Sequence, residues 1–331
     1  MTELAGNAAP ARSSGRQSGR VLDGPDFLCA GLQKAATGWL YDQLQFHPEF
    51  WMPPVKELHY FDTTFPNKRV QEAIEKILPN MERQSASRQV RGLRPLDGRD
   101  RDFFEVARGC IGRPVDLDRY AALFRQKGDL LAGDVTPNYS SLDEPVIDSI
   151  VARFPDIKVV ILLRDPVQRV MSQIAMVHRK AMTSGVRKAP ELAFKKLGPF
   201  KEFFFKYGFA DRHSPTQSVS RWRSRLPRDQ FAFFFFDDIA SQPEVVRRGI
   251  LTFLGADPDK KGRHEAGYNR KASQNKLILP DEIQKFLKEH FRSELEQSAL
   301  MFGEYGERWL ARHFPSTETA SPYTDEASHK P

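Results

Sequence analysis

The feature that most constrains the fold is the run Lys158–Leu163 (KVVILL), which is apolar at successive positions and rich in β-branched residues. A strand with one solvated face alternates between polar and apolar residues, and this run does not. It therefore predicts a strand at the centre of a parallel sheet that is covered by helices on both faces.

Three more apolar runs have the character of short buried strands: Phe27–Ala30, Leu130–Gly133 and Phe231–Phe236. We assign the last of them to the core. Helical patterns occur at Trp39–Phe46, Asp118–Phe124, Glu144–Phe154, Pro243–Leu254 and Asp281–Leu300. Strands that alternate with helices imply right-handed crossovers. We therefore expect an α/β fold with a doubly wound, mainly parallel sheet flanked by helices.

The same patterns indicate how the chain is divided. We expect residues 26–314 to form a single domain, for which the chain of 331 residues is long enough. Residues 1–25 lack the apolar core of a secretory signal and are rich in Ala, Ser, Gly and Arg, so we expect them to be disordered. Residues 315–331 are expected to form a disordered tail. The polar, Arg-rich stretch near residues 80–115 predicts a long loop.

The charge and the cysteine content indicate which kinds of partner and which compartment suit the chain. The net charge of +7 favours an anionic ligand, but the charges are scattered, which argues against a nucleic-acid-binding arm. No apolar run approaches the ~20 residues of a membrane span. Two cysteines do not make a disulfide framework, so we expect a reducing, cytoplasmic location. The oligomeric state is left open.

Two strand–helix junctions carry side chains suited to phosphate. At the first, Gly31 and Gly38 allow tight turns, Lys34 supplies a charge, and Thr37 supplies a hydroxyl that we expect to cap the following helix. Its lysine precedes the threonine by three positions, so it is not a Walker A sequence. The alternative reading of this segment is a surface turn with a solvated lysine.

The second junction follows the central strand. Asp165 is a candidate N-cap, Pro166 suits the first helical position, and Gln168 completes a pattern similar to a capping box. Arg164 then lies at the end of the strand and Ser172 within the first two helical turns, so both can reach one phosphate. The alternative is that Arg164 pairs with an acid at a sheet edge.

Together, GLQKAATGWL (residues 31–40) and VVILLRDPVQRVMS (residues 159–172) resemble the paired loops of the sulfotransferases that use 3'-phosphoadenosine-5'-phosphosulfate (PAPS). The resemblance implies a fold similar to that of P-loop NTPases. It also implies that the 5'-phosphosulfate is bound by Lys34, Ala35, Ala36, Thr37, Gly38 and Trp39. Arg164 and Ser172 would hold the 3'-phosphate. Ala36 and Gly38 depart from the family's K-x-G-T-T pattern, in which a glycine and a second threonine occupy these positions.

The segment PVKELHYFD (residues 54–62) is similar to the K-E-x-H-[FY]-F segment of heparan-sulfate and related carbohydrate sulfotransferases. The resemblance makes Glu57 the general base, with His59 beside it. GDVTPNY (residues 133–139) resembles a further family segment, but Val135 stands where heparan-type members have a lysine. This departure weakens the case for a polyanionic glycan acceptor. Arg270 and Lys271 lie where family members place a basic loop over the nucleotide.

The function implied is transfer of a sulfuryl group from PAPS to a hydroxyl or amine of a carbohydrate, lipid or small metabolite, without a metal. Two alternatives stay open: a P-loop-type small-molecule kinase, for which Asp134 at a strand end would be the Walker B acid, and a non-catalytic nucleotide-binding protein of the same fold. Residues 179–213 are basic and aromatic and predict a mostly helical lid beside the cleft, which does not identify the acceptor.

Overall fold

A computed structural model describes residues 24–183, 194–209, 214–268 and 277–315. Its sheet has four strands in the order β2-β1-β3-β4, and every pair of neighbours is parallel. The strands are β1 (Phe27–Cys29), β2 (Gly133–Val135), β3 (Lys158–Leu163) and β4 (Phe231–Phe235). This is the doubly wound α/β architecture expected from the sequence.

The central strand is where the sequence places it. β3 pairs with β1 on one side and with β4 on the other, and its residues from Val159 to Leu163 are fully buried. β4 differs from the expectation of a core strand. It lies at the sheet edge, and only Phe235 of its five residues is buried, while the other four are partly exposed. The other edge strand, β2, is buried at all three residues, so neither the edge position nor apolar composition by itself decided burial.

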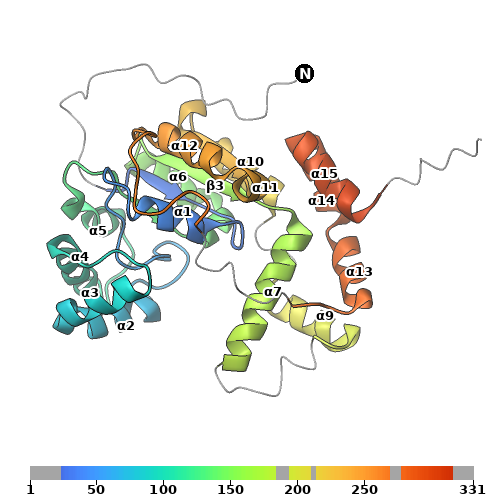
Figure 1. Cartoon of the computed structure of the whole chain (residues 1–331), viewed down its shortest axis with the longest axis horizontal. Helices are drawn as coiled ribbons and strands as arrows, with labels where there is room; N and C mark the ends of the chain where they lie inside the picture. The colour runs from blue at the N-terminus through green and yellow to red at the C-terminus, as the bar shows by residue number, and fades with distance from the viewer. Residues whose placement is uncertain (1–23, 184–193, 210–213, 269–276, 316–331) are drawn as a thin grey trace, which may run out of the picture.

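The helices account for most of the described chain. Their bounds are α1 (Thr37–Leu44), α2 (Lys68–Ile77), α3 (Met81–Val90), α4 (Gly98–Gly109), α5 (Leu117–Ala122), α6 (Glu144–Arg153), α7 (Pro166–Thr183), α9 (Leu197–Lys206), α10 (Pro215–Arg223), α11 (Phe236–Ser241), α12 (Pro243–Leu254), α13 (Asp281–His290), α14 (Arg292–Phe302) and α15 (Glu304–His313). In Figure 1, α2–α5 gather on one side of the sheet region, and α7, α9 and α13–α15 extend on the other.

The prediction of a long loop near residues 80–115 was wrong, because α3 and α4 occupy most of that stretch. The Asp97 side chain accepts a hydrogen bond from the Asp100 backbone N–H, and Asp100 returns one to the Asp97 backbone, which completes a capping box. Phe103 and Phe104 are fully buried on one side of α4. The polar, Arg-rich composition reflects the exposed faces of these helices: α4 buries a narrow apolar stripe, whereas the buried residue of α3 is Arg88.

Smaller differences concern boundaries. The second strand begins at Gly133, three residues later than expected. The pattern from Asp281 to Leu300 forms two helices, which meet at Phe291. The predicted lid contains the end of α7 and all of α9, and its remaining parts at 184–193 and 210–213 lie outside the described residues.

The strand order determines what lies together. Cys29 of β1 is in register with Val135 of β2 and with Val160 of β3. Parallel strands present their carboxyl ends at one edge of the sheet, which is where ligands bind in open α/β folds. The segments that follow β1, β2 and β3 are therefore neighbours, although about 130 positions separate the first from the last.

Candidate active site

The loop after β1 has the backbone of an anion site. Lys34 and Ala36 both have left-handed φ angles, 71° and 74°, a conformation that favours glycine. Ala36 is the N-cap residue of α1, and no side chain caps this helix or places an acid in its first turn. The N–H groups at the start of α1 are thus available to an anionic ligand.

Thr37 does not cap the helix as expected, because it is the first helical residue and Ala36 occupies the cap position. Its hydroxyl instead accepts a hydrogen bond from Lys56 Nζ at 3.5 Å. Ala35 is fully buried. A Cβ built on Gly38 would meet no atom within 4 Å, so no neighbouring atom among the described residues requires a glycine at this position.

The two predicted phosphate loops are in direct contact. Arg164 Nη1 donates a hydrogen bond to the carbonyl oxygen of Lys34 at 2.8 Å, and the guanidinium lies 3.9 Å from the ring centroid of Phe236. Burial lowers the pKa of Arg164, an effect that Asp165 and Asp237 oppose. Its Nε is buried and has no hydrogen-bond partner. A buried cation with an unpaired donor is suited to an anion.

Asp165 caps α7 as predicted. Its Oδ1 accepts hydrogen bonds from the backbone N–H groups of Val167 and Gln168, and its side chain is fully buried. Ser172 is half-buried on α7. It follows Asp165 by seven positions, which puts the two residues on the same face of the helix.

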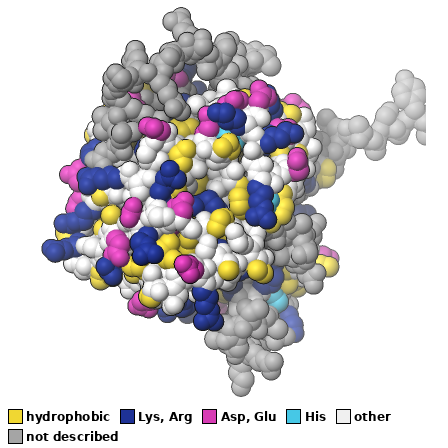
Figure 2. Space-filling view, turned by 60° about the vertical axis from the view of Figure 1, so that its left-hand side comes forward, with side chains coloured by type: hydrophobic (Ala, Val, Ile, Leu, Met, Phe, Trp, Pro, Cys, Tyr) yellow, Lys and Arg dark blue, Asp and Glu magenta, His cyan; other side chains and the backbone are white. Residues whose placement is uncertain are grey.

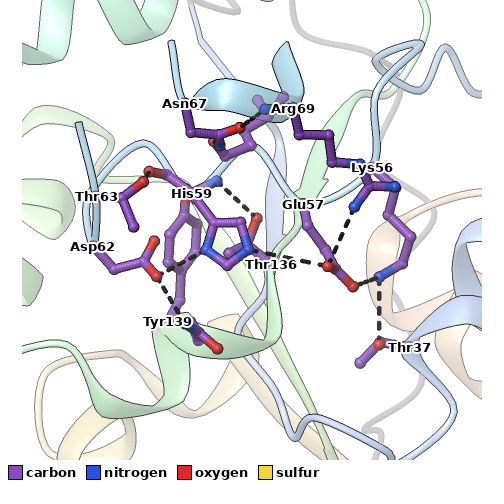
Figure 3. Close-up of polar contacts among 12 residues, drawn as sticks. Thr37, Lys56, Glu57, His59, Asp62, Thr63, Asn67, Arg69, Thr136 and Tyr139 are labelled. Atoms are coloured by element: carbon purple, nitrogen blue, oxygen red, sulfur yellow. Dashed lines mark hydrogen bonds and ion pairs between the residues drawn. The ribbon is translucent and has the colours of Figure 1, made fainter. Parts of the chain in front are cut away.

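Lys56 connects the first phosphate loop to the predicted base (Figure 3). Its Nζ lies 3.5 Å from Thr37 Oγ1 and 2.6 Å from Glu57 Oε1. The other carboxylate oxygen of Glu57 is 3.5 Å from Arg69 Nη1 and 4.0 Å from His59 Nε2. The carboxylate is therefore surrounded by three groups that carry or can carry positive charge.

His59 is oriented by an acid. Its Nδ1 lies 2.8 Å from Asp62 Oδ2, and that oxygen also accepts a hydrogen bond from Asn138 Nδ2 at 3.0 Å (Figure 3). Figure 3 shows the imidazole between Asp62 and Glu57. Both Glu57 and His59 have left-handed φ angles, 64° and 54°. Such backbone strain in non-glycine residues is concentrated at functional sites.

The electrostatics distinguish the two candidates for the base. Burial acts to raise the pKa of Glu57, but Lys56, Arg69 and His59 together bring it below its usual value. Burial acts to lower the pKa of His59, and Asp62 and Glu57 outweigh it, so that the pKa is raised. Both shifts favour the charged forms of the two side chains, the carboxylate of Glu57 and the imidazolium of His59.

β2 and the residues that follow it anchor the Lys56–Asp62 segment. Asp134 Oδ1 accepts from the Leu58 N–H at 3.5 Å, and Tyr139 Oη, itself 2.7 Å from Asp134 Oδ2, accepts from the Tyr60 N–H at 2.9 Å. Between them, Thr136 Oγ1 accepts from the His59 N–H at 3.5 Å. The backbone N–H groups of three consecutive residues thus donate to side chains of residues 134–139.

Asp134 is not placed as a Walker B acid. Its side chain is buried, and both carboxylate oxygens accept hydrogen bonds from protein donors, including the hydroxyls of Thr136, Tyr120 and Tyr139. Burial raises its pKa despite these bonds. The geometry gives Asp134 the role of an internal anchor.

The basic loop predicted over the nucleotide falls on Arg270 and Lys271, which lie outside the described residues. The segment that leads to them is tied to α1, because Trp39 Nε1 donates to the carbonyl oxygen of Ala266 at 2.6 Å and Gln43 Nε2 to that of Glu265 at 3.1 Å. Trp39 is buried and belongs to this packing.

The sequence analysis missed three residues of the site: Lys56, Asp62 and Arg69. Lys56 and Asp62 lie within the motif already singled out, so their proximity to Glu57 and His59 was a usable signal. Arg69 comes from the first turn of α2, in a region where the sequence pattern did not resolve the helix boundaries.

Charged side chains of both signs are mixed on one face of the molecule (Figure 2). Figure 2 shows the face that carries α2–α5, where cationic and anionic side chains are interspersed with apolar ones. Within the described ranges, no group of three His, Cys, Asp or Glu residues is arranged to hold a metal ion. Among the same residues, no helix has the length and apolar character to cross a membrane.

Comparison with known proteins agrees with this geometry. The model of the Sulfotransferase family matches residues 25–260. A sulfotransferase from Alicyclobacillus acidocaldarius has a similar solved structure, with a TM-score of 0.55 and 20% sequence identity, over 86% of this chain and 98% of that one. No curated protein matches the sequence.

Two further solved structures match with lower TM-scores. The sulfotransferase domain of the Synechococcus PCC 7002 olefin synthase gives a TM-score of 0.40 at 18% identity, over 81% of this chain and 95% of that one. A sulfotransferase domain from the curacin biosynthetic pathway gives 0.44 at 15% identity, over 82% and 98%.

The fold is a parallel sheet flanked by helices, and the candidate site lies at the carboxyl edge of that sheet. The chain belongs to the sulfotransferase family, because the family model covers well over half of its length. It is an enzyme that moves sulfuryl groups.

Proposed function

We propose that this enzyme transfers a sulfuryl group from PAPS to a hydroxyl or amine of a small-molecule, lipid or carbohydrate acceptor, with Glu57 as the general base. The observation that carries the proposal is the contact chain from Thr37 through Lys56 to Glu57, which joins the anion-binding loop to an ionised carboxylate. A sulfuryl donor bound in that loop would lie next to the group that accepts the acceptor's proton.

Features of the chain itself fit the co-substrate. The uncapped N-terminus of α1 and the left-handed residues Lys34 and Ala36 suit the 5'-phosphosulfate. Arg164, with its unpaired Nε and its bond to Lys34, suits the 3'-phosphate. Ser172, on the same helix as the Asp165 cap, is the proposed hydroxyl donor to that phosphate. PAPS supplies the activated sulfuryl group when bound.

The residues have separable roles. Lys34 and Lys56 place positive charge where negative charge develops on the phosphate oxygen. One preorganised donor of this kind stabilises the transition state by ~3 kcal/mol. Glu57 accepts the acceptor's proton, and His59 and Arg69 hold its carboxylate in position. Transfer of this kind passes through a loose, in-line transition state, so orientation contributes more than the strength of the base. The lowered pKa of Glu57 is compatible with that role.

The test begins with a screen of radiolabelled PAPS against pools of sugars, lipids, phenols and other metabolites. With an acceptor in hand, Glu57→Gln should lower the transfer rate by roughly 10²–10⁴-fold, the usual contribution of a well-placed base. The dissociation constant of adenosine 3',5'-bisphosphate should change less than about threefold, because Glu57 contacts the loop only through Lys56.

His59→Gln is the comparison variant, since it keeps a side chain of similar polarity and leaves the carboxylate in place. We expect a smaller loss of rate than for Glu57→Gln. A fully active Glu57→Gln enzyme with an inactive His59→Gln enzyme would transfer the role of base to His59. Nucleotide binding with no transfer to any acceptor pool would instead identify a non-catalytic binding protein.

A further inference from the structure

The carboxyl-terminal helix α15 reaches the second phosphate loop, although the family model ends at residue 260. Four of its residues face the ends of β3 and β4: Tyr305, Trp309, Arg312 and His313. Their spacing of four, three and one puts them on a single face of a helix. α15 therefore presents one continuous surface to the loop that carries Arg164.

The strongest contacts converge on Asp165. Arg312 Nη1 lies 2.9 Å and His313 Nε2 lies 2.8 Å from Asp165 Oδ2, while Oδ1 of the same carboxylate caps α7. The Asp165 side chain is fully buried and that of His313 is 7% exposed. A buried charge-assisted pair of this kind is costly to break on one side only.

The same helix also contacts the first turn of α11, which follows β4 directly. Arg312 Nη2 lies 3.2 Å from Asp237 Oδ1, Trp309 Nε1 donates to Asp237 Oδ2 at 3.1 Å, and the Tyr305 hydroxyl donates to Asp238 at 2.6 Å. Phe236, immediately before these acids, is the ring on which the Arg164 guanidinium lies. Arg312 thus bridges the two strand ends between which Arg164 is placed.

The hairpin that carries these residues is rigidly built. A Cβ on Gly306 would lie 2.0 Å from the carbonyl oxygen of Ser298, so α14 and α15 approach as closely as only a glycine permits. α14 is fastened in turn to the start of α10, where Glu294 accepts hydrogen bonds from Ser214 and Thr216. The hairpin can therefore impose a position on the groups it contacts.

We propose that the α14–α15 hairpin is a positioning element of the nucleotide site, in which Arg312 and His313 fix Asp165 and Asp237 and thereby orient Arg164 toward the 3'-phosphate. The inference rests on the proposed use of PAPS. Arg312 also adds a second cation near Arg164, and its charge contributes to lowering the pKa of that residue. The two carboxylates bind Arg312 directly, and their charges act on Arg164 as well.

The experiment compares two nucleotides that differ only in the 3'-phosphate. Isothermal titration calorimetry measures the dissociation constants of adenosine 3',5'-bisphosphate and adenosine 5'-monophosphate for the full chain. We expect Arg312→Ala to weaken the bisphosphate about tenfold, the usual effect of losing a charge-assisted contact, and the monophosphate less than about twofold. A role limited to stability would lower the melting temperature and leave the ratio of the two constants unchanged.

Arg308→Ala is the matched control. It removes the same charge from the same helix, but Arg308 is exposed, and its guanidinium contacts Glu304 at 4.0 Å and the Tyr305 ring at 4.6 Å from the centroid rather than Asp165 or Asp237. The ratio should stay within about twofold of the wild type, because exposed pairs contribute little. An equal change in both variants would reduce the effect of Arg312 to net charge and overturn the proposal.

A double-mutant cycle separates positioning from direct binding. If Arg312 acts through Arg164, Arg312→Ala should have no further effect on the ratio in an Arg164→Ala background. Additive losses would overturn the positioning role. Arg312→Lys keeps the charge but lacks the two guanidinium nitrogens that bridge the carboxylates, so it should also lose the preference for the bisphosphate over the monophosphate. It provides a folded variant should the alanine destabilise the chain. A lysine variant that prefers the bisphosphate as strongly as the wild type would contradict the bridging role of Arg312.

The wild type tests the underlying function separately. If the unmodified protein does not prefer the bisphosphate over the monophosphate, the proposed 3'-phosphate site is wrong, and the inference falls with it. If the wild type has the preference and the Arg312 variants retain it, only the role of the hairpin is refuted.

Discussion

Ala36 illustrates how a single residue can keep the geometry of a family loop while departing from its sequence. The related pattern has a glycine at this position, and Ala36 has the φ angle of 74° that explains why a glycine is favoured there. The sequence comparison raised the question of whether the loop geometry survives. The left-handed backbone answers it, since the turn is formed without the glycine.

Replacing Ala36 by glycine should remove this backbone strain. We expect Ala36→Gly to increase the free energy of unfolding by about 0.5–1 kcal/mol, because an alanine in the left-handed region costs about 1–2 kcal/mol and the added flexibility of the unfolded chain offsets part of the gain. Urea denaturation monitored by tryptophan fluorescence measures the change. Ala35→Gly is the control: Ala35 is fully buried and lacks a left-handed φ angle, so that variant should be less stable than the wild type. A destabilised Ala36→Gly protein would show that the strain is absent in solution.

At the scale of elements, β2 and the residues after it determine where the Lys56–Asp62 segment lies. Leu58, His59 and Tyr60 each give a backbone N–H to a side chain of residues 134–139. The sequence identified both segments, but assigned Asp134 a metal-binding role in the kinase alternative. A buried carboxylate with four protein donors is a structural anchor, and its interaction with the neighbouring loop depends on β1 and β2 being adjacent.

Asp134→Asn should therefore impair catalysis through the backbone of the Lys56–Asp62 segment. The amide would place an NH₂ group where a carboxylate oxygen now accepts hydrogen bonds from hydroxyls, so hydrogen-bond donors would face donors. We expect the free energy of unfolding to fall by about 1–3 kcal/mol. We also expect a large fall in transfer rate with bisphosphate affinity close to wild type, measured by the sulfotransfer assay and by calorimetry. Tyr120→Phe removes only the donor at 3.3 Å and should have a smaller effect on both. Normal activity in Asp134→Asn would refute the anchoring role.

For the whole molecule, the sheet is the frame that brings separate segments to one edge. The carboxyl ends of β2, β1 and β3 lie in a row, and the segments that follow them supply the anchor, the phosphate loop and Arg164. α15 contacts Asp165, which follows β3, although Arg312 lies 147 positions further along the chain. Binding of one nucleotide across the two phosphate loops should consequently stabilise the entire fold.

That stabilisation gives the prediction at this scale. Adenosine 3',5'-bisphosphate at a hundredfold excess over its dissociation constant should stabilise the protein by ~2.7 kcal/mol, in the presence of EDTA. Differential scanning fluorimetry measures the accompanying rise in melting temperature. ATP with Mg²⁺ is the comparison ligand and should give a smaller shift, because it lacks a 3'-phosphate for Arg164. A response to ATP and Mg²⁺ alone would contradict the use of PAPS.

The sequence by itself determined the central strand, the α/β class and the positions of the two strand–helix junctions after β1 and β3. Each of these depends on local patterns, such as the unbroken apolar run of β3 or the order Arg164-Asp165-Pro166. Local patterns failed where a helix buries few apolar residues, as in α3 and α4, and where an apolar strand is left partly exposed, as in β4.

Only the tertiary structure decided which side chains meet. Lys56 reaches Thr37 across 19 positions, Asp134 reaches Leu58 across 76, and Arg312 reaches Asp165 across 147. Periodicity describes which face of an element is apolar, but not which element lies against it. The order of the strands and the packing of the helices make that choice, because they minimise exposed apolar surface over the whole chain at once.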